Sequence, residues 1–240
     1  MTKSKGLTGN ALKYIAITAM LIDHIAWAFV PFGSALGQVM HIIGRITAPT
    51  MCYFIAEGYH HTHNVKKYAL RLAIFAAISY FAYTFEHTGT FLAVYNAGMI
   101  YTLLLGLIAL VVWNDDSIMK PLKITITVFL CLISLFGDWP IFGILYVLAF
   151  GLNYGDFKKQ IKWLSIITLC MLVFASIPII INGGRWYREV FHLGVFFAVP
   201  LLAMYNGQRG RGGKFNKWVF YVFYPLHLLI LGILKYYVFK

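Results

Sequence analysis

Asp23 and His24 lie side by side in the middle of the first apolar segment, Ala11 to Pro31. The segment is long enough to cross a bilayer, since a spanning helix needs roughly 20 apolar residues. An ionisable group inside hydrocarbon costs a few kcal/mol, so such groups usually face a protein interior and serve a function there. We interpret the pair as a candidate site for proton transfer; a buried polar pair satisfied by neighbouring helices is the structural alternative.

Lys13 is expected to share a helix face with His24. The two positions are 11 residues apart, which is close to a whole number of helical turns and corresponds to about 16 Å along the axis. A cation at the membrane surface and a proton carrier deeper inside would suit a substrate with phosphates outside and a reactive end within. The alternative is a snorkelling lysine and an unrelated buried histidine.

Three other groups are expected at a similar depth. A second helix that runs inward from near Gly37 places Arg45 about 12 Å deep, with His41 one turn away on the same face. The last helix, which starts near Lys217, places His227 about 15 Å deep. Together with the acidic residue of the first helix, these groups can form a buried polar network.

The composition predicts an integral membrane protein. Of its 240 residues, 60% are apolar and only 12% are charged, whereas soluble domains are roughly 25% charged. The chain therefore reads as one membrane domain, residues 1–240, with no room for a soluble catalytic domain. We expect an all-α polytopic transmembrane bundle of about nine helices, near residues 11–31, 37–59, 68–85, 94–113, 121–136, 140–152, 161–181, 190–205 and 217–239. The fifth and sixth are either thin spans or a re-entrant pair.

Positive charge predicts the orientation. Lysine and arginine gather on one side of the expected membrane, at Lys3, Lys5, Lys13, Lys66, Lys67, Arg71, Lys120, Lys123, Lys158, Lys159, Lys162, Arg209, Arg211, Lys214 and Lys217. The other side holds Arg185, Arg188, Lys235 and Lys240. By the positive-inside rule, the N-terminus is cytoplasmic and the C-terminus external. The net charge of +12 thus has a topological explanation. Membrane lipid is an expected partner, and no nucleic-acid-binding motif is present.

The polar stretch after the second helix contains His60, His61 and His63. Their spacing matches no zinc signature, so we expect no metal site there. The lysines and arginine that follow, including Lys67 and Arg71, are better suited to phosphate or lipid. On the external side, polar residues either rim an acceptor site or belong to an interfacial belt; they are Glu86–His87, Asp138–Trp139 and Arg185–Glu189.

Several motifs resemble those of the TraX family. They are Leu7-Thr-Gly-Asn-x-Leu-Lys13, Met20-x-Ile-Asp-His24, Ile43-Gly-Arg-Ile-x-x-Pro49, Glu57-Gly-Tyr59, Thr62-x-Asn-Val-Lys-Lys-Tyr68, Arg71-Leu72 and Phe223-Tyr-Pro-Leu-His-Leu228. This family is associated with N-terminal acetylation of conjugative pilin. It is similar in plan to multi-pass membrane acyltransferases that modify surface sugars and carry a basic residue, ten residues and then a histidine. Lys13-x10-His24 fits that pattern, although the basic residue there is often arginine.

The resemblance implies an acetyl-CoA-dependent acyltransferase in a bacterial cytoplasmic membrane. Acetyl-CoA would approach from the cytoplasm, and the acceptor would be a pilin-like peptide or a cell-surface glycan. No metal and no particular oligomeric state are predicted. The candidate catalytic residues are His24, Asp23, Arg45 and His227, and those expected to bind the donor are Lys13, Asn10, Lys67, Arg71 and Asn64. In this scheme His24 is a general base or acyl carrier, Asp23 orients its surroundings or pairs with Arg45, and Arg45 or His227 stabilises an oxyanion.

Two other functions remain open. The first is a proton-coupled transporter with Asp23, His24, Arg45 and His227 as its relay, although no clear inverted repeat supports it. The second is a non-catalytic partner in the assembly of an envelope complex.

Overall fold

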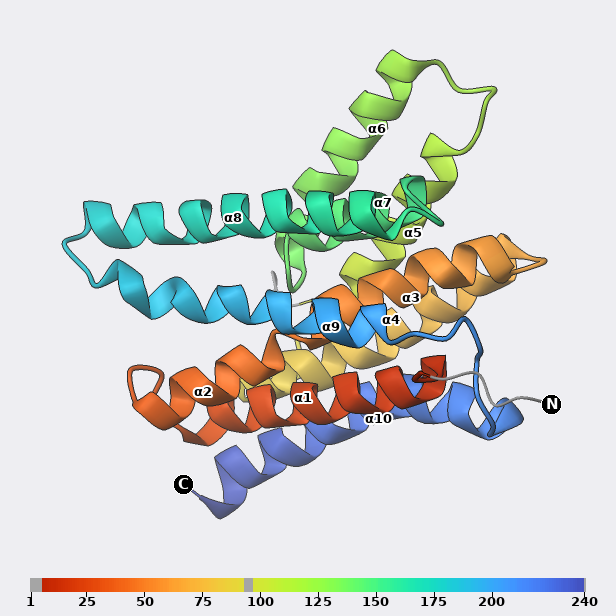
Figure 1. Ribbon diagram of the computed structural model, residues 1–240. Helices are drawn as coiled ribbons and strands as arrows, with labels where there is room; N and C mark the ends of the chain where they lie inside the picture. The colour runs from red at the N-terminus through yellow and green to blue at the C-terminus, as the bar shows by residue number, and fades with distance from the viewer. Residues whose placement is uncertain (1–5, 93–96, 240) are drawn as a thin grey trace. The chain divides into compact units, whose positions relative to one another are not determined.

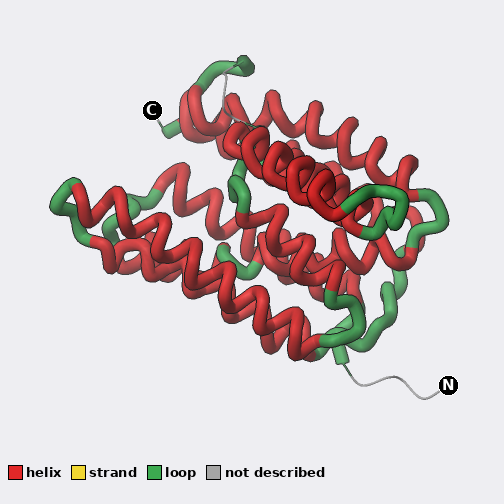
Figure 2. The backbone as a smooth tube through the Cα atoms, turned by 90° about the horizontal axis from the view of Figure 1, so that it is seen from above, coloured by secondary structure: helices red, strands yellow, loops and turns green. Residues whose placement is uncertain are grey.

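The computed structural model describes residues 6–92 and 97–239. Figure 2 shows helices joined by loops, and the described residues form no strand beyond two isolated bridges. The predicted all-α fold is confirmed. The α-helices are α1 (Gly9–Phe29), α2 (Ala35–Gly44), α3 (Thr47–His61), α4 (Val65–Thr88), α5 (Met99–Trp113), α6 (Lys120–Ile133), α7 (Phe142–Leu152), α8 (Phe157–Ile181), α9 (Ala198–Ala203) and α10 (Gly213–Ile233).

Five stretches of the described chain are long and apolar enough to cross a membrane, judged by length and composition. They are Gly9–Phe29, Ala35–His61, Val65–Thr88, Phe157–Ile181 and Trp218–Val238. The helices α5 and α7 are apolar but shorter. The chain is thus a polytopic helical membrane protein, and its orientation stays a prediction.

The chain divides into two compact units. Unit 1 comprises Met1–Thr50 and Ser165–Tyr224, and unit 2 comprises Met51–Leu164 and Pro225–Lys240. In unit 1, α1 packs on α2, and α2 packs on a 3₁₀ segment, Trp186–Phe197, that leads into α9 (Figure 1). In unit 2, α5 packs against α4 and α7. The single membrane domain expected from the sequence stays a prediction.

Polar N-caps explain why three helices begin two or three residues earlier than the apolar runs suggest. The side chains of Thr8, Ser34 and Asn64 accept hydrogen bonds from backbone N–H groups in the first turns of α1, α2 and α4. Such bonds satisfy N–H groups that have no partner within the helix. The first turns are therefore helical although they are not uniformly apolar.

Two expected helices differ from prediction. The helix expected at 37–59 is interrupted at Arg45 and Ile46, so α2 ends and α3 begins within one candidate span. The helix expected at 190–205 is instead the 3₁₀ segment followed by the short α9. Gly194 of this segment lies so close to the carbonyl of Ile42 that a Cβ would collide with it. The 3₁₀ segment therefore packs tightly, backbone against backbone, on α2. The periodicity of apolar residues in the sequence does not reveal such packing. The expected start of the 94–113 helix lies outside the described residues.

Candidate functional site

The carboxylate of Asp23 joins two side chains of the α2 segment in unit 1. Its Oδ1 lies 2.7 Å from Nδ1 of His41, and its Oδ2 accepts a hydrogen bond of 3.1 Å from Nη1 of Arg45. All three residues are buried. Of the two roles expected for Asp23, pairing with Arg45 is the one observed, and His41 is a second partner that was not among the candidate catalytic residues. We call these three residues the Asp23 cluster.

The close approach of α1 and α2 depends on Gly44. A Cβ at this position would collide with the side chain of Asp23. One turn further along the chain, the hydroxyl of Thr47 donates a hydrogen bond of 2.9 Å to the carbonyl of Ala16. The ion pair is therefore built into the helix contact, and removal of one partner from such a buried pair costs about 3–5 kcal/mol.

Aromatic rings enclose His41. The ring centroids of Trp27, Phe32 and Phe191 lie 4.3, 5.5 and 5.6 Å from that of His41. The guanidinium of Arg45 lies 4.5 Å from the centroid of Phe191. With its Nδ1 against a carboxylate, the imidazole has its Nε2 buried and without a hydrogen-bond partner in the described part of the chain. A carboxylate on one ring nitrogen orients the other as a proton acceptor.

His24 follows Asp23 on α1 and is also buried. Its ring lies 6.4 Å from that of Tyr224, in an edge-on arrangement. Neighbours on a helix point about 100° apart, so the two side chains meet different surroundings. Unit 1 thus holds two histidines, one carboxylate and one guanidinium within a pair of packed helices. Such a set can accept a proton and stabilise an oxyanion.

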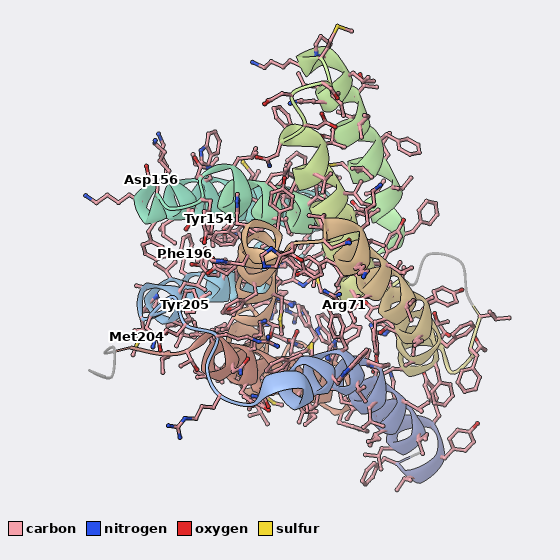
Figure 3. All side chains as sticks on the ribbon, turned by 90° about the vertical axis from the view of Figure 1, so that its right-hand side faces the viewer. Arg71, Tyr154, Asp156, Phe196, Met204 and Tyr205 are labelled. Carbon is pink, nitrogen blue, oxygen red and sulfur yellow. The ribbon has the colours of Figure 1, made fainter. Side chains whose placement is uncertain are left out.

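Near the N-terminus of α1, the chain before α10 returns to this helix. The Gly9 and Asn10 N–H groups donate to the carbonyls of Gln208 and Arg209, at 2.8 and 3.0 Å. The Asn10 amide donates to the Arg211 carbonyl at 2.8 Å. Asn10 is one of the residues expected to bind acetyl-CoA. In the structure, its backbone and side-chain hydrogen bonds hold this basic loop instead. Figure 3 labels Met204 and Tyr205, where the chain leaves α9 toward this loop.

Lys13 lies one turn further along α1. Its Nζ is 5.6 Å from the ring centroid of Phe220. Both Lys13 and the returning loop belong to unit 1. The start of α1 therefore gathers positive charge from two segments that are far apart in the sequence.

The remaining candidates belong to unit 2, and their roles stay predictions. Asn64 caps α4 by accepting a hydrogen bond of 2.8 Å from the N–H of Lys67. Arg71, labelled in Figure 3, projects from α4, with its guanidinium 5.5 Å from the ring of Tyr68. The Nε of Arg71 is buried and has no hydrogen-bond partner among the residues described. His227 lies buried in α10.

The two histidines at the end of α3 contact side chains and backbone of unit 2. His60 lies 3.0 Å from the carbonyl of Gly151 and stacks on Tyr154. His61 lies 2.9 Å from the hydroxyl of Tyr154 and 3.3 Å from the carboxylate of Glu57. Within the described ranges, no three histidine, cysteine, aspartate or glutamate residues are grouped to hold a metal ion.

The one-turn spacing of His41 and Arg45 was read from the sequence, but His41 was not among the candidate catalytic residues. A second pair was missed. Glu189 and His192, three residues apart, lie 3.3 Å from each other in the 3₁₀ segment. Because residues i and i+3 eclipse in a 3₁₀ helix, this spacing also suggests a pair, but only once the 3₁₀ geometry is known.

Comparisons with known proteins agree with the motifs of this site. A family model described as TraX protein matches residues 8–235. The chain is also 28% identical over 240 residues to a probable fimbrial assembly protein FimC, serogroup H1, of Dichelobacter nodosus, covering 96% of this chain and 97% of that protein. No solved structure matches. Because the family model spans nearly the whole sequence, the chain belongs to the TraX family.

Proposed function

We propose that this protein is a membrane-embedded acetyltransferase that moves an acetyl group from acetyl-CoA to the N-terminal amine of a pilin-like peptide. The observation that carries the proposal is the buried carboxylate of Asp23, which joins His41 and Arg45 beside His24. The resemblance to a fimbrial assembly protein favours a peptide acceptor over a surface glycan. The site would lie in a bacterial cytoplasmic membrane.

Each role follows from the chemistry of the side chain. His24 acts as the general base on the acceptor nitrogen, or carries the acetyl group briefly. Arg45 places a cation where negative charge develops on the thioester oxygen, and removal of one such donor typically slows turnover about 10²–10³-fold. Asp23 is a positioning residue, because it holds Arg45 and His41 in place. His227 is the alternative oxyanion donor.

Basic side chains would bind the phosphates of acetyl-CoA. Lys13 lies on α1, about three turns from His24, so the phosphates and the thioester can occupy opposite ends of this helix. Lys67 and Arg71 of unit 2 are further candidates. The lysine ammonium binds phosphate as a compact charge, whereas the arginine guanidinium can form two parallel hydrogen bonds to it.

The test measures the transfer of the acetyl group directly. Purified protein in nanodiscs is mixed with isotopically labelled acetyl-CoA and a peptide with a pilin-like N-terminus. We expect the peptide to gain the mass of one acetyl group, and His24→Ala to abolish the gain. His63→Ala, which alters an exposed loop histidine, is the matched control. Absence of transfer to the peptide, and to a glycan acceptor tried in parallel, would overturn the proposal.

A second function, a non-catalytic role in pilus assembly, is favoured by the name of the relative. It makes a different prediction in cells. In a strain that lacks this chain, His24→Ala would restore pili as well as the wild type does, and the pilin would carry no acetyl group in either case.

A further inference from the structure

The basic loop before α10, residues 208–214 of unit 1, has a backbone that two helices hold in place. Asn10 of α1 donates two hydrogen bonds to it, from its N–H to the Arg209 carbonyl at 3.0 Å and from its amide to the Arg211 carbonyl at 2.8 Å. The Arg211 carbonyl also accepts a hydrogen bond of 2.9 Å from the amide of Asn216, in the first turn of α10. The loop therefore has a defined conformation against the start of α1.

Two glycines allow the loop to lie this close to the helices. Gly210 has a φ of +88°, and a Cβ there would lie 2.6 Å from the hydroxyl oxygen of Thr8, the residue that caps α1. Gly212 has a φ of +120°, and a Cβ there would collide with the amide of Asn216. Residues with a side chain rarely adopt such φ values. The positive-inside rule places basic residues on one side of a membrane but requires no particular backbone conformation, so it does not account for a loop built in this way.

The arginine side chains of the basic loop lie where unit 1 has no carboxylate to offer them. Arg209 and Arg211 are both exposed, and Nη2 of Arg209 donates a hydrogen bond of 3.3 Å to the Gly213 carbonyl. Unit 1 contains two acidic residues, Asp23 and Glu189, and both pair with side chains of the α2 region or the 3₁₀ segment. The charge of the two arginines is therefore available to an anion from outside unit 1.

The basic loop, Lys13 and His24 follow one another along α1. Asn10 binds the loop, and Lys13, three residues later, lies on the same side of the helix. The rise of the helix places Lys13 about 4.5 Å beyond Asn10 and His24 about 16 Å further. Coenzyme A has its groups in the same order, with a 3′-phosphate on the ribose, then a diphosphate, and then the pantetheine arm that ends in the thioester. A donor whose thioester lies at His24 and whose diphosphate lies at Lys13 therefore has its 3′-phosphate at the loop.

We propose that Arg209 and Arg211 bind the ribose 3′-phosphate of acetyl-CoA and make the protein specific for the phosphorylated coenzyme. This proposal rests on the acetyltransferase function proposed above. A phosphate monoester carries about two negative charges at neutral pH, and its free oxygens match the parallel hydrogen bonds of a guanidinium. The diphosphate has fewer free oxygens on each phosphorus and suits the compact charge of Lys13. A lipid headgroup also offers a phosphate, so the test includes lipid.

Comparison of acetyl-CoA with acetyl-3′-dephospho-CoA tests the proposal, because the two donors differ only in this phosphate. For the wild type in nanodiscs of neutral lipid, we expect Kd and KM to be about 10- to 100-fold higher for the dephosphorylated donor, the effect of one lost charge-assisted hydrogen bond, with a similar kcat. Arg211→Gln should raise both constants for acetyl-CoA by a similar factor and leave those for the dephosphorylated donor unchanged, since both changes remove the same contact. Arg209→Gln should act in the same direction.

Two control variants separate this contact from a general loss of positive charge. Lys162→Gln removes an exposed basic side chain of α8 and should leave the binding of both donors unchanged. Lys13→Ala should weaken both donors by the same factor, because both carry the diphosphate. The ratio of the two Kd values is therefore the readout that belongs to the basic loop.

Equal binding of the two donors by the wild type, or equal weakening of both by Arg211→Gln, would overturn the proposal. An effect of Arg211→Gln that appears only in nanodiscs with anionic lipid would also overturn it and assign the loop to a lipid headgroup. The Kd values are measured by equilibrium dialysis without an acceptor. A protein that discriminates between the two donors but transfers no acetyl group would therefore contradict only the proposed function.

Discussion

Each compact unit contains a buried carboxylate that is joined to a histidine and to a longer basic side chain. In unit 1 the carboxylate belongs to Asp23, and its partners are His41, which is 0% exposed, and Arg45. These partners lie around the break between α2 and α3, and aromatic rings cover the imidazole. The helix backbones meet there because Gly44 has no side chain.

In unit 2 the carboxylate belongs to Glu86, near the end of α4. Its Oε2 lies 2.7 Å from Nδ1 of His87, and its Oε1 lies 3.6 Å from Nζ of Lys235. The partner side chains are 35% and 28% exposed. Lys235 and Tyr236 also donate hydrogen bonds to the backbone carbonyl of Glu86, at 3.1 and 3.3 Å.

The difference teaches that side-chain types alone do not distinguish a reactive cluster from a structural one. The Glu86 group ties the π-helical turn Leu234–Val238 to the end of α4, and its histidine and lysine are partly exposed. The Asp23 cluster joins α1 to α2 with every member sheltered and a second histidine beside it on α1. Low local dielectric strengthens electrostatic interactions, so we assign chemistry to the Asp23 cluster and a structural role to Glu86.

Asp23→Asn should have the largest combined effect on turnover and stability, because it removes the charge that both His41 and Arg45 face. We expect turnover to fall about 10²–10⁴-fold and the free energy of unfolding to fall by about 3–5 kcal/mol. Glu86→Gln should also destabilise the protein while turnover per folded molecule is retained. Thermal unfolding and acetyl transfer, both measured in nanodiscs, separate the two effects. Equal losses of turnover in the two variants would contradict the assignment.

His24→Ala should abolish acetyl transfer while the protein still inserts and folds. The physical reason is the loss of a proton acceptor, which contributes about 10²–10⁴-fold to a typical rate. His87→Ala is the counterpart in unit 2 and should leave transfer intact. If His24→Ala folds and turns over normally, His24 is structural, and the same assay on His227→Ala then decides whether the base lies there.

Gly44→Ala should separate α1 from α2, since the added methyl group collides with Asp23. Overpacking of this kind typically costs about 1–3 kcal/mol, and turnover should fall with it. Gly58→Ala is the matched change in unit 2, where the added atom meets the hydroxyl of Tyr68 at 2.8 Å, the end of a side chain that can shift. The free energy of unfolding and the turnover are measured for both variants and compared. A Gly44→Ala protein with normal turnover would show that the close approach of α1 and α2 is not required.

Lys13→Ala should weaken the binding of acetyl-CoA more than it slows the chemical step. A hydrogen bond to a charged group contributes about 1.5–3 kcal/mol. Its loss corresponds to about a 10- to 100-fold rise in the dissociation constant of acetyl-CoA. Lys13→Arg should keep most of the function. Saturation kinetics with acetyl-CoA measure the effect; a loss confined to the maximal rate would show that Lys13 does not hold the donor.

Lys235→Ala should have the smallest effect. The side chain is partly exposed, and His87 remains beside Glu86, so we expect a loss of about 1 kcal/mol or less in unfolding free energy. Acetyl transfer should be unchanged. A large loss of transfer would mean that the Glu86 group takes part in the reaction.

Periodicity and apolar length located most helices correctly, because burial in a membrane imposes a strong pattern on sequence. The depth of a residue follows from the rise of its helix, and this placed Asp23 and Arg45 at similar depths, so that their pairing was one of the two arrangements expected. The same reasoning did not identify His41 as the closer partner of Asp23. Rotation about the helix axis depends on the contact between α1 and α2, which the local sequence does not specify.

The sequence by itself determined the membrane class, the family motifs and the presence of ionisable groups within the apolar segments, since each depends on residue type and spacing along one helix. The tertiary structure decided which of those groups meet. The break at Arg45, the approach at Gly44 and the 3₁₀ segment that brings Glu189 and His192 toward Arg45 all depend on backbone packing between segments distant in the chain. Such contacts depend on the shapes of both surfaces, so no single stretch of sequence encodes them.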